Sequence, residues 1–90
     1  MAKLHAIVKG KVQGVWYRAW AQDLAASMNL SGWVRNLNDG NVETEAYGER
    51  AVLETFLEKL YDGPPLARVA EVETAWAESG ETPSGFRVRR

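Results

Sequence analysis

Alternating polar and apolar residues open the chain and then give way to a helical period. Over Lys3–Lys9 the alternation, interrupted only at Ile7, predicts a strand with one face on a core. From Tyr17 onward the apolar residues recur at helical spacing. Asn29 is a suitable end for that helix, because asparagine tolerates the left-handed conformation of a C-terminal cap. The first third of the chain therefore predicts a strand followed by a helix.

The rest of the chain repeats these two periods. Asp39-Gly40 between two alternating segments indicates a β-hairpin, because both residues accept positive φ. A second amphipathic helix, with apolar residues from Val52 to Leu60, ends at Asp62-Gly63-Pro64-Pro65. The predicted strands of this part are Ser31–Asn36, Val42–Tyr47, Arg68–Trp76 and Phe86–Arg89.

The predicted order of elements is β-α-β-β-α-β with a short terminal strand. Two amphipathic helices on one face of a mainly antiparallel sheet bury both apolar stripes at once. The sequence therefore predicts an α+β fold, a ferredoxin-like α/β sandwich. Because 90 residues are too few for two separately folded units, residues 1–90 are expected to form a single domain. This architecture hosts many unrelated functions and leaves the chemistry open.

Composition narrows the function classes. The formal net charge of −1 disfavours a general nucleic-acid binder, which carries a basic excess. The absence of cysteine excludes disulfides, thiolate nucleophiles and cysteine-based metal sites. No long apolar run indicates a signal peptide or a membrane helix, so we expect a cytoplasmic protein with no membrane partner. Since no cluster of ligating side chains and no spare apolar helix face is visible, we expect no metal, no cofactor and a monomer.

The segment Gly10–Arg18, Gly-Lys-Val-Gln-Gly-Val-Trp-Tyr-Arg, carries the first candidate chemistry. Its two glycines allow a tight turn in which successive backbone N–H groups face one hollow. The helix that begins near Tyr17 directs its free N–H groups and positive dipole end to the same place, which suits a phosphate. Arg18, in the first turn, adds a planar pair of donors and a permanent charge. On spacing alone, a plain strand-to-helix turn with a solvated arginine is the more common interpretation.

The segment Gly32–Asn36, Gly-Trp-Val-Arg-Asn, carries the second candidate. Asn36 is a poor strand former, and it precedes a hairpin that already has its turn residues. Its amide offers an acceptor and two donors, which could hold a water molecule and a phosphoryl oxygen together. Taken alone, Asn36 fits the capping of its own turn better.

Together the two segments strongly resemble the acylphosphatase family, and the order of elements, the Asp-Gly hairpin and the final strand extend the resemblance over the whole chain. Only Tyr17 departs slightly, since the family often has Phe there. The resemblance implies a metal-free hydrolase that cleaves the carboxyl–phosphate anhydride of acyl phosphates to a carboxylate and inorganic phosphate. It implies that Arg18 binds the phosphate and that Asn36 orients the attacking water. It also implies a phosphate-binding loop whose backbone N–H groups come from Gln13, Gly14, Val15, Trp16 and Tyr17.

The remaining polar and aromatic residues indicate less. His5, the only histidine, is expected to be structural or exposed. Trp20 and Trp33 are assigned to core packing. Three cations flank the two motifs and either steer anions or are simply solvated, namely Lys9, Lys11 and Arg35. The glutamates that alternate along strands are expected on solvated faces: Glu43, Glu45, Glu71 and Glu73.

Three other functions are compatible with the predicted fold. A phosphate- or acyl-carrier-binding module without turnover would keep Arg18 and could dispense with Asn36. An RNA-recognition domain stacks bases on aromatic residues of its central strands, where this chain offers only Tyr47. A metal chaperone of this fold would need a Cys-x-x-Cys motif, which is absent. An enzyme is therefore favoured.

Overall fold

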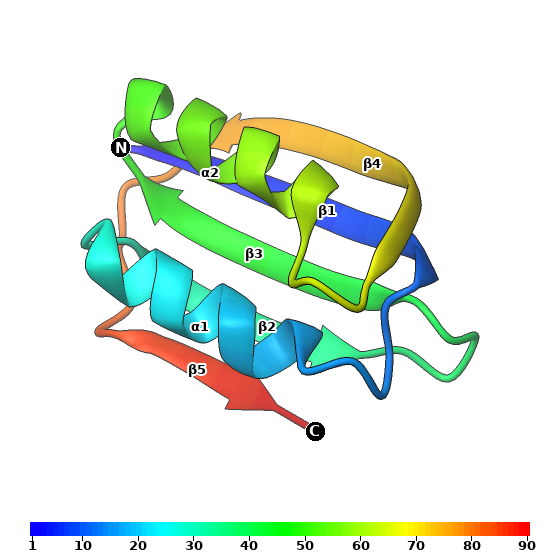
Figure 1. The fold of residues 1–90 in the computed structure, drawn as a ribbon. Helices are drawn as coiled ribbons and strands as arrows, with labels where there is room; N and C mark the ends of the chain where they lie inside the picture. The colour runs from blue at the N-terminus through cyan, green and yellow to red at the C-terminus, as the bar shows by residue number, and fades with distance from the viewer.

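The computed structural model describes all residues, Met1–Arg90, and consists of one five-stranded sheet and two helices (Figure 1). The strand order is β4-β1-β3-β2-β5, and both helices cover the same face of the sheet. The ferredoxin-like α+β fold predicted from the sequence is thereby confirmed. The elements are β1 (Ala2–Lys11), α1 (Tyr17–Ser27), β2 (Ser31–Asn36), β3 (Val42–Gly48), α2 (Arg50–Asp62), β4 (Arg68–Glu78) and β5 (Phe86–Arg89).

The strand pairing determines which chain segments meet at one edge of the sheet. β3 pairs antiparallel with both β1 and β2, so β1 and β2 run in the same direction. β5 pairs parallel with β2, with Val34 opposite Val88 and Arg35 opposite Arg89. The carboxyl ends of β1, β2 and β5 therefore lie at the same edge, and α1 begins there because it follows β1 (Figure 1).

The core lies between the sheet and the two helices. Alternate residues of β1 face it as predicted, and Leu4, Ala6 and Val8 are fully buried. From α2, Leu53, Phe56 and Leu60 complete the same core, which fits the helical period of that segment. Neither helix is long and apolar enough to cross a membrane.

Some elements extend beyond their predicted ends. β1 reaches from Ala2 to Lys11 because it is paired on both sides, with β3 and with β4. A register shift between Lys9 and Gly10 bends its last part. Gly10 has φ 128°, and a Cβ there would lie 2.2 Å from the carbonyl oxygen of Arg68, so only glycine fits this close approach. Asn29 adopts φ 57° just after α1, which confirms the predicted left-handed end.

The sheet face opposite the helices differs from expectation at Trp33, at Glu43 and at Glu45, whose side chain is only 19% exposed and accepts a hydrogen bond from the hydroxyl of Tyr47. Trp33 was predicted in the core, but its neighbour Val34 points there, and successive side chains of a strand alternate between faces. Trp33 instead lies half-buried on the opposite face, where the guanidinium carbons of Arg35 and Arg89 lie 5.3 Å and 4.7 Å from its ring centroid. Trp20, in contrast, packs against the core as predicted.

Glu43 is the second difference, because its side chain is only 14% exposed instead of solvated. Its two carboxylate oxygens contact His5 Nε2 at 2.7 Å and Arg35 Nε at 2.6 Å. Burial acts to raise the pKa of Glu43, but the hydrogen bonds and charges of His5 and Arg35 outweigh it and hold that pKa below its ordinary value. Of the three cations that flank the two motifs, Arg35 is thus ion-paired, and Lys9 Nζ lies 3.2 Å from Glu73 Oε1, so neither is simply solvated.

Candidate active site

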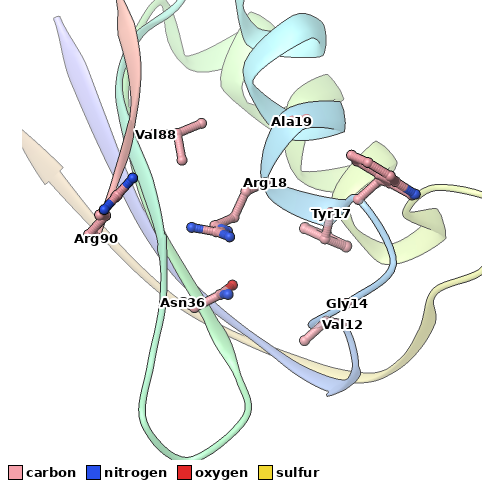
Figure 2. A pocket seen from close by; sticks show the side chains of 9 residues that line it. Val12, Gly14, Tyr17, Arg18, Ala19, Asn36, Val88 and Arg90 are labelled. Carbon is pink, nitrogen blue, oxygen red and sulfur yellow. The ribbon is translucent and has the colours of Figure 1, made fainter.

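A hollow of about 870 Å³ opens where β1, β2 and β5 end and α1 begins (Figure 2). It is lined from the loop between β1 and α1, from the first turn of α1, and from the ends of β2 and β5. Both sequence segments singled out for chemistry therefore meet in one place. The lining residues are Val12, Gly14, Trp16, Tyr17, Arg18, Ala19, Asn36, Val88 and Arg90.

The loop that leads into α1 turns by means of two left-handed residues. Gly14 has φ 74°, which costs glycine little, and Trp16 has φ 68°, which is rare for a bulky side chain. The backbone N–H groups from Gln13 to Arg18 donate none of the hydrogen bonds that turns, loops and caps make. The first N–H groups of α1 also have no partner within the helix. This loop and helix end thus present a series of unpaired donors.

The electrostatics of this helix end favour an anion. The first turn of α1 contains no acidic residue, and no side chain caps its N-terminus. The partial positive charge of the helix is therefore not neutralised locally. Unpaired N–H groups and the dipole together make a phosphate- or carboxylate-binding position.

Gln13 fixes the loop through its side chain. Its Nε2 donates to the carbonyl oxygen of Leu37 at 2.7 Å and to that of Asn41 at 2.8 Å. Both acceptors belong to the hairpin between β2 and β3, directly beyond Asn36. The loop and the end of β2 are thereby held at a fixed distance. This anchoring role of the side chain was not foreseen from the sequence, which indicated only a backbone contribution.

Arg18 reaches from α1 into the hollow, as Figure 2 shows. Its side chain takes part in no ion pair and no hydrogen bond within the protein, whereas Lys9, Arg35 and Arg50 are all paired with glutamates. A guanidinium without an internal partner retains all five of its donors for a ligand.

Asn36 points into the same hollow from the end of β2 (Figure 2). Its side chain makes no hydrogen bond within the protein, and the hairpin is capped by Asp39, whose Oδ1 accepts from the backbone N–H of Asn41 at 3.0 Å. The alternative that Asn36 caps its own turn therefore does not describe this structure. Its amide is available for a ligand or water.

Tyr17 directs its side chain away from the hollow. The hydroxyl donates to the carbonyl oxygen of Leu60 in α2 at 2.5 Å, and the ring packs edge-to-face on Trp20 with centroids 5.2 Å apart. Burial raises the pKa of Tyr17 well above its usual value. The extra hydroxyl relative to Phe thus has a buried partner, and only the backbone of Tyr17 is placed to serve a ligand.

Four lining residues were not anticipated. Val12 and Ala19 flank the loop, whereas Val88 and Arg90 come from the last residues of the chain. The last two reach the site because β5 pairs with β2, and a pairing between strands so far apart in sequence leaves no local signal. No group of three or more His, Cys, Asp or Glu lies close enough together to hold a metal ion.

Comparisons with known proteins agree with this arrangement. A family model described as Acylphosphatase matches residues 4–88. The acylphosphatase of Thermus thermophilus is 51% identical over 88 residues, which cover 98% of this chain and 99% of that protein. The acylphosphatase of an Anaeromyxobacter species is 47% identical over 89 residues, covering 99% of this chain and 96% of that protein.

A solved structure extends the agreement to the fold. The crystal structure of acylphosphatase from Bacillus subtilis superposes with a TM-score of 0.96 at 34% identity, covering 100% of both chains. Sequence, fold and family model coincide over nearly the whole chain. The chain therefore belongs to the acylphosphatase family, enzymes that hydrolyse acyl phosphates.

Proposed function

We propose that the hollow holds the phosphoryl group of an acyl phosphate and hydrolyses its carboxyl–phosphate anhydride to a carboxylate and inorganic phosphate. The observation that carries the proposal is that three sets of unpaired groups converge there. They are the backbone N–H groups from Gln13 to Tyr17, the guanidinium of Arg18 and the amide of Asn36. In this proposal, residues 1–90 form a single catalytic domain of the acylphosphatase type.

Binding of the phosphoryl group is assigned to the loop and to Arg18. The backbone donors of Gly14, Val15, Trp16 and Tyr17 surround the phosphoryl oxygens in a fixed nest. Arg18 adds a bidentate, permanently charged partner. Phosphoryl transfer spreads charge over the equatorial oxygens, and preorganised donors stabilise that charge without rearrangement.

Asn36 is assigned to the attacking water. Its amide oxygen accepts a hydrogen bond from the water, while its NH₂ group donates to a phosphoryl oxygen. This arrangement holds the water in line with the bond to be broken, which is the main demand of the reaction. A phosphate-binding module without turnover would not require a free amide at this position.

The proposed reaction needs no general acid. The new bond forms between the water oxygen and phosphorus, and the bond between phosphorus and the acyl oxygen breaks. The departing carboxylate takes the electron pair, and its conjugate acid has a pKa of about 4, so it leaves without protonation. The proton of the water passes to an oxygen of the substrate itself, because none of the lining residues is a carboxylate or a histidine.

We further propose that the enzyme is a cytoplasmic monomer that acts without a metal or cofactor. The positive charge that a metal ion would supply is assigned instead to Arg18 and the helix end. The experiment is hydrolysis of a model acyl phosphate, followed by its ultraviolet absorbance, with and without a chelator. Turnover should be unaffected by the chelator and should not need Mg²⁺. Turnover that is abolished by the chelator and restored by a metal would remove the proposed mechanism.

A further inference from the structure

The hollow is much larger than a phosphate requires. Its volume of about 870 Å³ is in the range of sites for whole small molecules. The groups assigned to the phosphoryl moiety occupy only part of its wall. Five of the nine lining residues are hydrophobic, and two of these, Trp16 and Val88, belong to the few large apolar side chains that the protein exposes.

Trp16 differs from the other tryptophans of the chain. Trp20 packs on Tyr17, Trp33 contacts two arginines, and the ring of Trp76 lies 3.8 Å from the guanidinium of Arg50. Trp16 has no aromatic or cationic partner within the protein and is 79% exposed, whereas the others are half-buried. Core packing therefore does not explain this side chain.

The backbone at Trp16 adds a second, independent observation. A bulky residue with φ 68° is conformationally strained, and such strain is concentrated at ligand-binding and catalytic positions. This residue forms the N-cap of α1, two residues before Arg18, and both residues line the same hollow. A flat apolar surface is thus held at the rim of the phosphate nest.

The direction of the reaction indicates what this surface contacts. The attacking water and the departing acyl oxygen lie on opposite sides of phosphorus. Asn36 comes from β2, while Trp16 belongs to the loop on the other wall of the hollow. With water on the side of Asn36, the acyl group extends toward Trp16.

We infer that Trp16 is a specificity-determining residue that contacts the acyl group of the substrate and favours acyl phosphates with a flat, aromatic acyl group. This inference rests on the proposed function. Aromatic rings stack in offset or edge-to-face arrangements, which a small aliphatic acyl group cannot reproduce.

The test compares benzoyl phosphate with acetyl phosphate on the wild type, Trp16→Ala and Trp16→Phe. Trp, Ala and Phe are all strained at the left-handed φ of position 16, so the three enzymes differ mainly in the ring that they carry there. Trp16→Ala should raise KM for benzoyl phosphate roughly three- to tenfold more than it raises KM for acetyl phosphate. Trp16→Phe should retain most of the preference.

Leu66→Ala is the matched control, because Leu66 is an exposed apolar residue of a neighbouring hollow on the other side of the loop. It should leave both KM values unchanged. An equal effect of Trp16→Ala on both substrates, or no effect, would overturn the inference while leaving hydrolysis intact. If the enzyme instead prefers an acyl group that bears a second negative charge, and Trp16→Ala does not change that preference, the inference is overturned and Arg90, the other cation of the hollow, is the specificity-determining residue. Failure of the wild type to hydrolyse either substrate would remove the proposed function itself.

Discussion

The side-chain amide of Gln13 donates a hydrogen bond of 2.7 Å to the carbonyl oxygen of Leu37, and Leu37 directly follows Asn36. The same amide also donates to the carbonyl oxygen of Asn41, so one side chain joins the loop before α1 to the hairpin. The position of Asn36 relative to the loop therefore depends on Gln13 as well as on the sheet. In the proposed reaction, the water at Asn36 and the phosphoryl group at the loop must be aligned, and displacement by about 1 Å can cost roughly 10²-fold in rate.

Gln13→Ala should lower turnover roughly ten- to hundredfold, because it removes both hydrogen bonds that align the loop with Asn36. Unfolding free energy should fall by only about 1–2 kcal/mol. Steady-state kinetics and urea denaturation measure the two effects. Gln22→Ala is the control, since Gln22 makes a similar bond to the Phe86 carbonyl at 3.1 Å. A Gln13→Ala enzyme with normal turnover would show that the loop does not need this anchor.

Tyr17→Phe should affect stability and leave catalysis unchanged. The hydroxyl donates to the carbonyl oxygen of Leu60 in the core, and its removal leaves that acceptor without this partner. We expect a loss of about 1–2 kcal/mol in unfolding free energy. Since the ring points away from the hollow, kcat and KM should stay within about twofold of the wild type. A large fall in kcat of the folded variant would place the hydroxyl in the site after all.

Glu43 should make stability depend on pH in the acidic range. Its folded pKa lies below the ordinary value of 4.5, so its contribution is fully present above that value and is lost as pH falls through the folded pKa. Glu43→Gln should lower the unfolding free energy at pH 7 by about 1–3 kcal/mol and reduce the acid-side slope. Urea titrations across this range provide the test, with exposed Glu54→Gln as the control. Equal acid slopes for Glu43→Gln and the wild type would contradict the assignment.

Much of the fold could be predicted because its signals are local. Ser31–Asn36 and Phe86–Arg89 have the predicted bounds, since alternation and turn residues delimit them. β1 and β4 run longer than predicted because pairing with neighbouring strands, which the sequence does not display, extends them. Trp33 was wrongly assigned to the core for a related reason. Its own hydrophobicity favoured burial, but the buried position of Val34 decides which face of β2 is inside.

The candidate site could be predicted only as far as its two local motifs reach. Arg18 and the loop adjoin each other in sequence, and Asn36 ends a recognisable strand. Val88 and Arg90 join them through the parallel pairing of β5 with β2, which involves no local pattern. The burial of Glu43 likewise depends on partners from β1 and β2. Tertiary pairing therefore accounts for what sequence analysis missed.

The central claim is that Arg18 binds the phosphoryl group whereas Asn36 places the water. The most direct measurement is titration of Asn36→Ala with inorganic phosphate, beside its rate on an acyl phosphate and with Arg18→Ala in parallel. Asn36→Ala should bind phosphate nearly as the wild type does, while turnover falls on the order of 10²–10³-fold. Arg18→Ala should lose both binding and turnover. A folded Asn36→Ala enzyme with normal turnover would contradict the water-placing role.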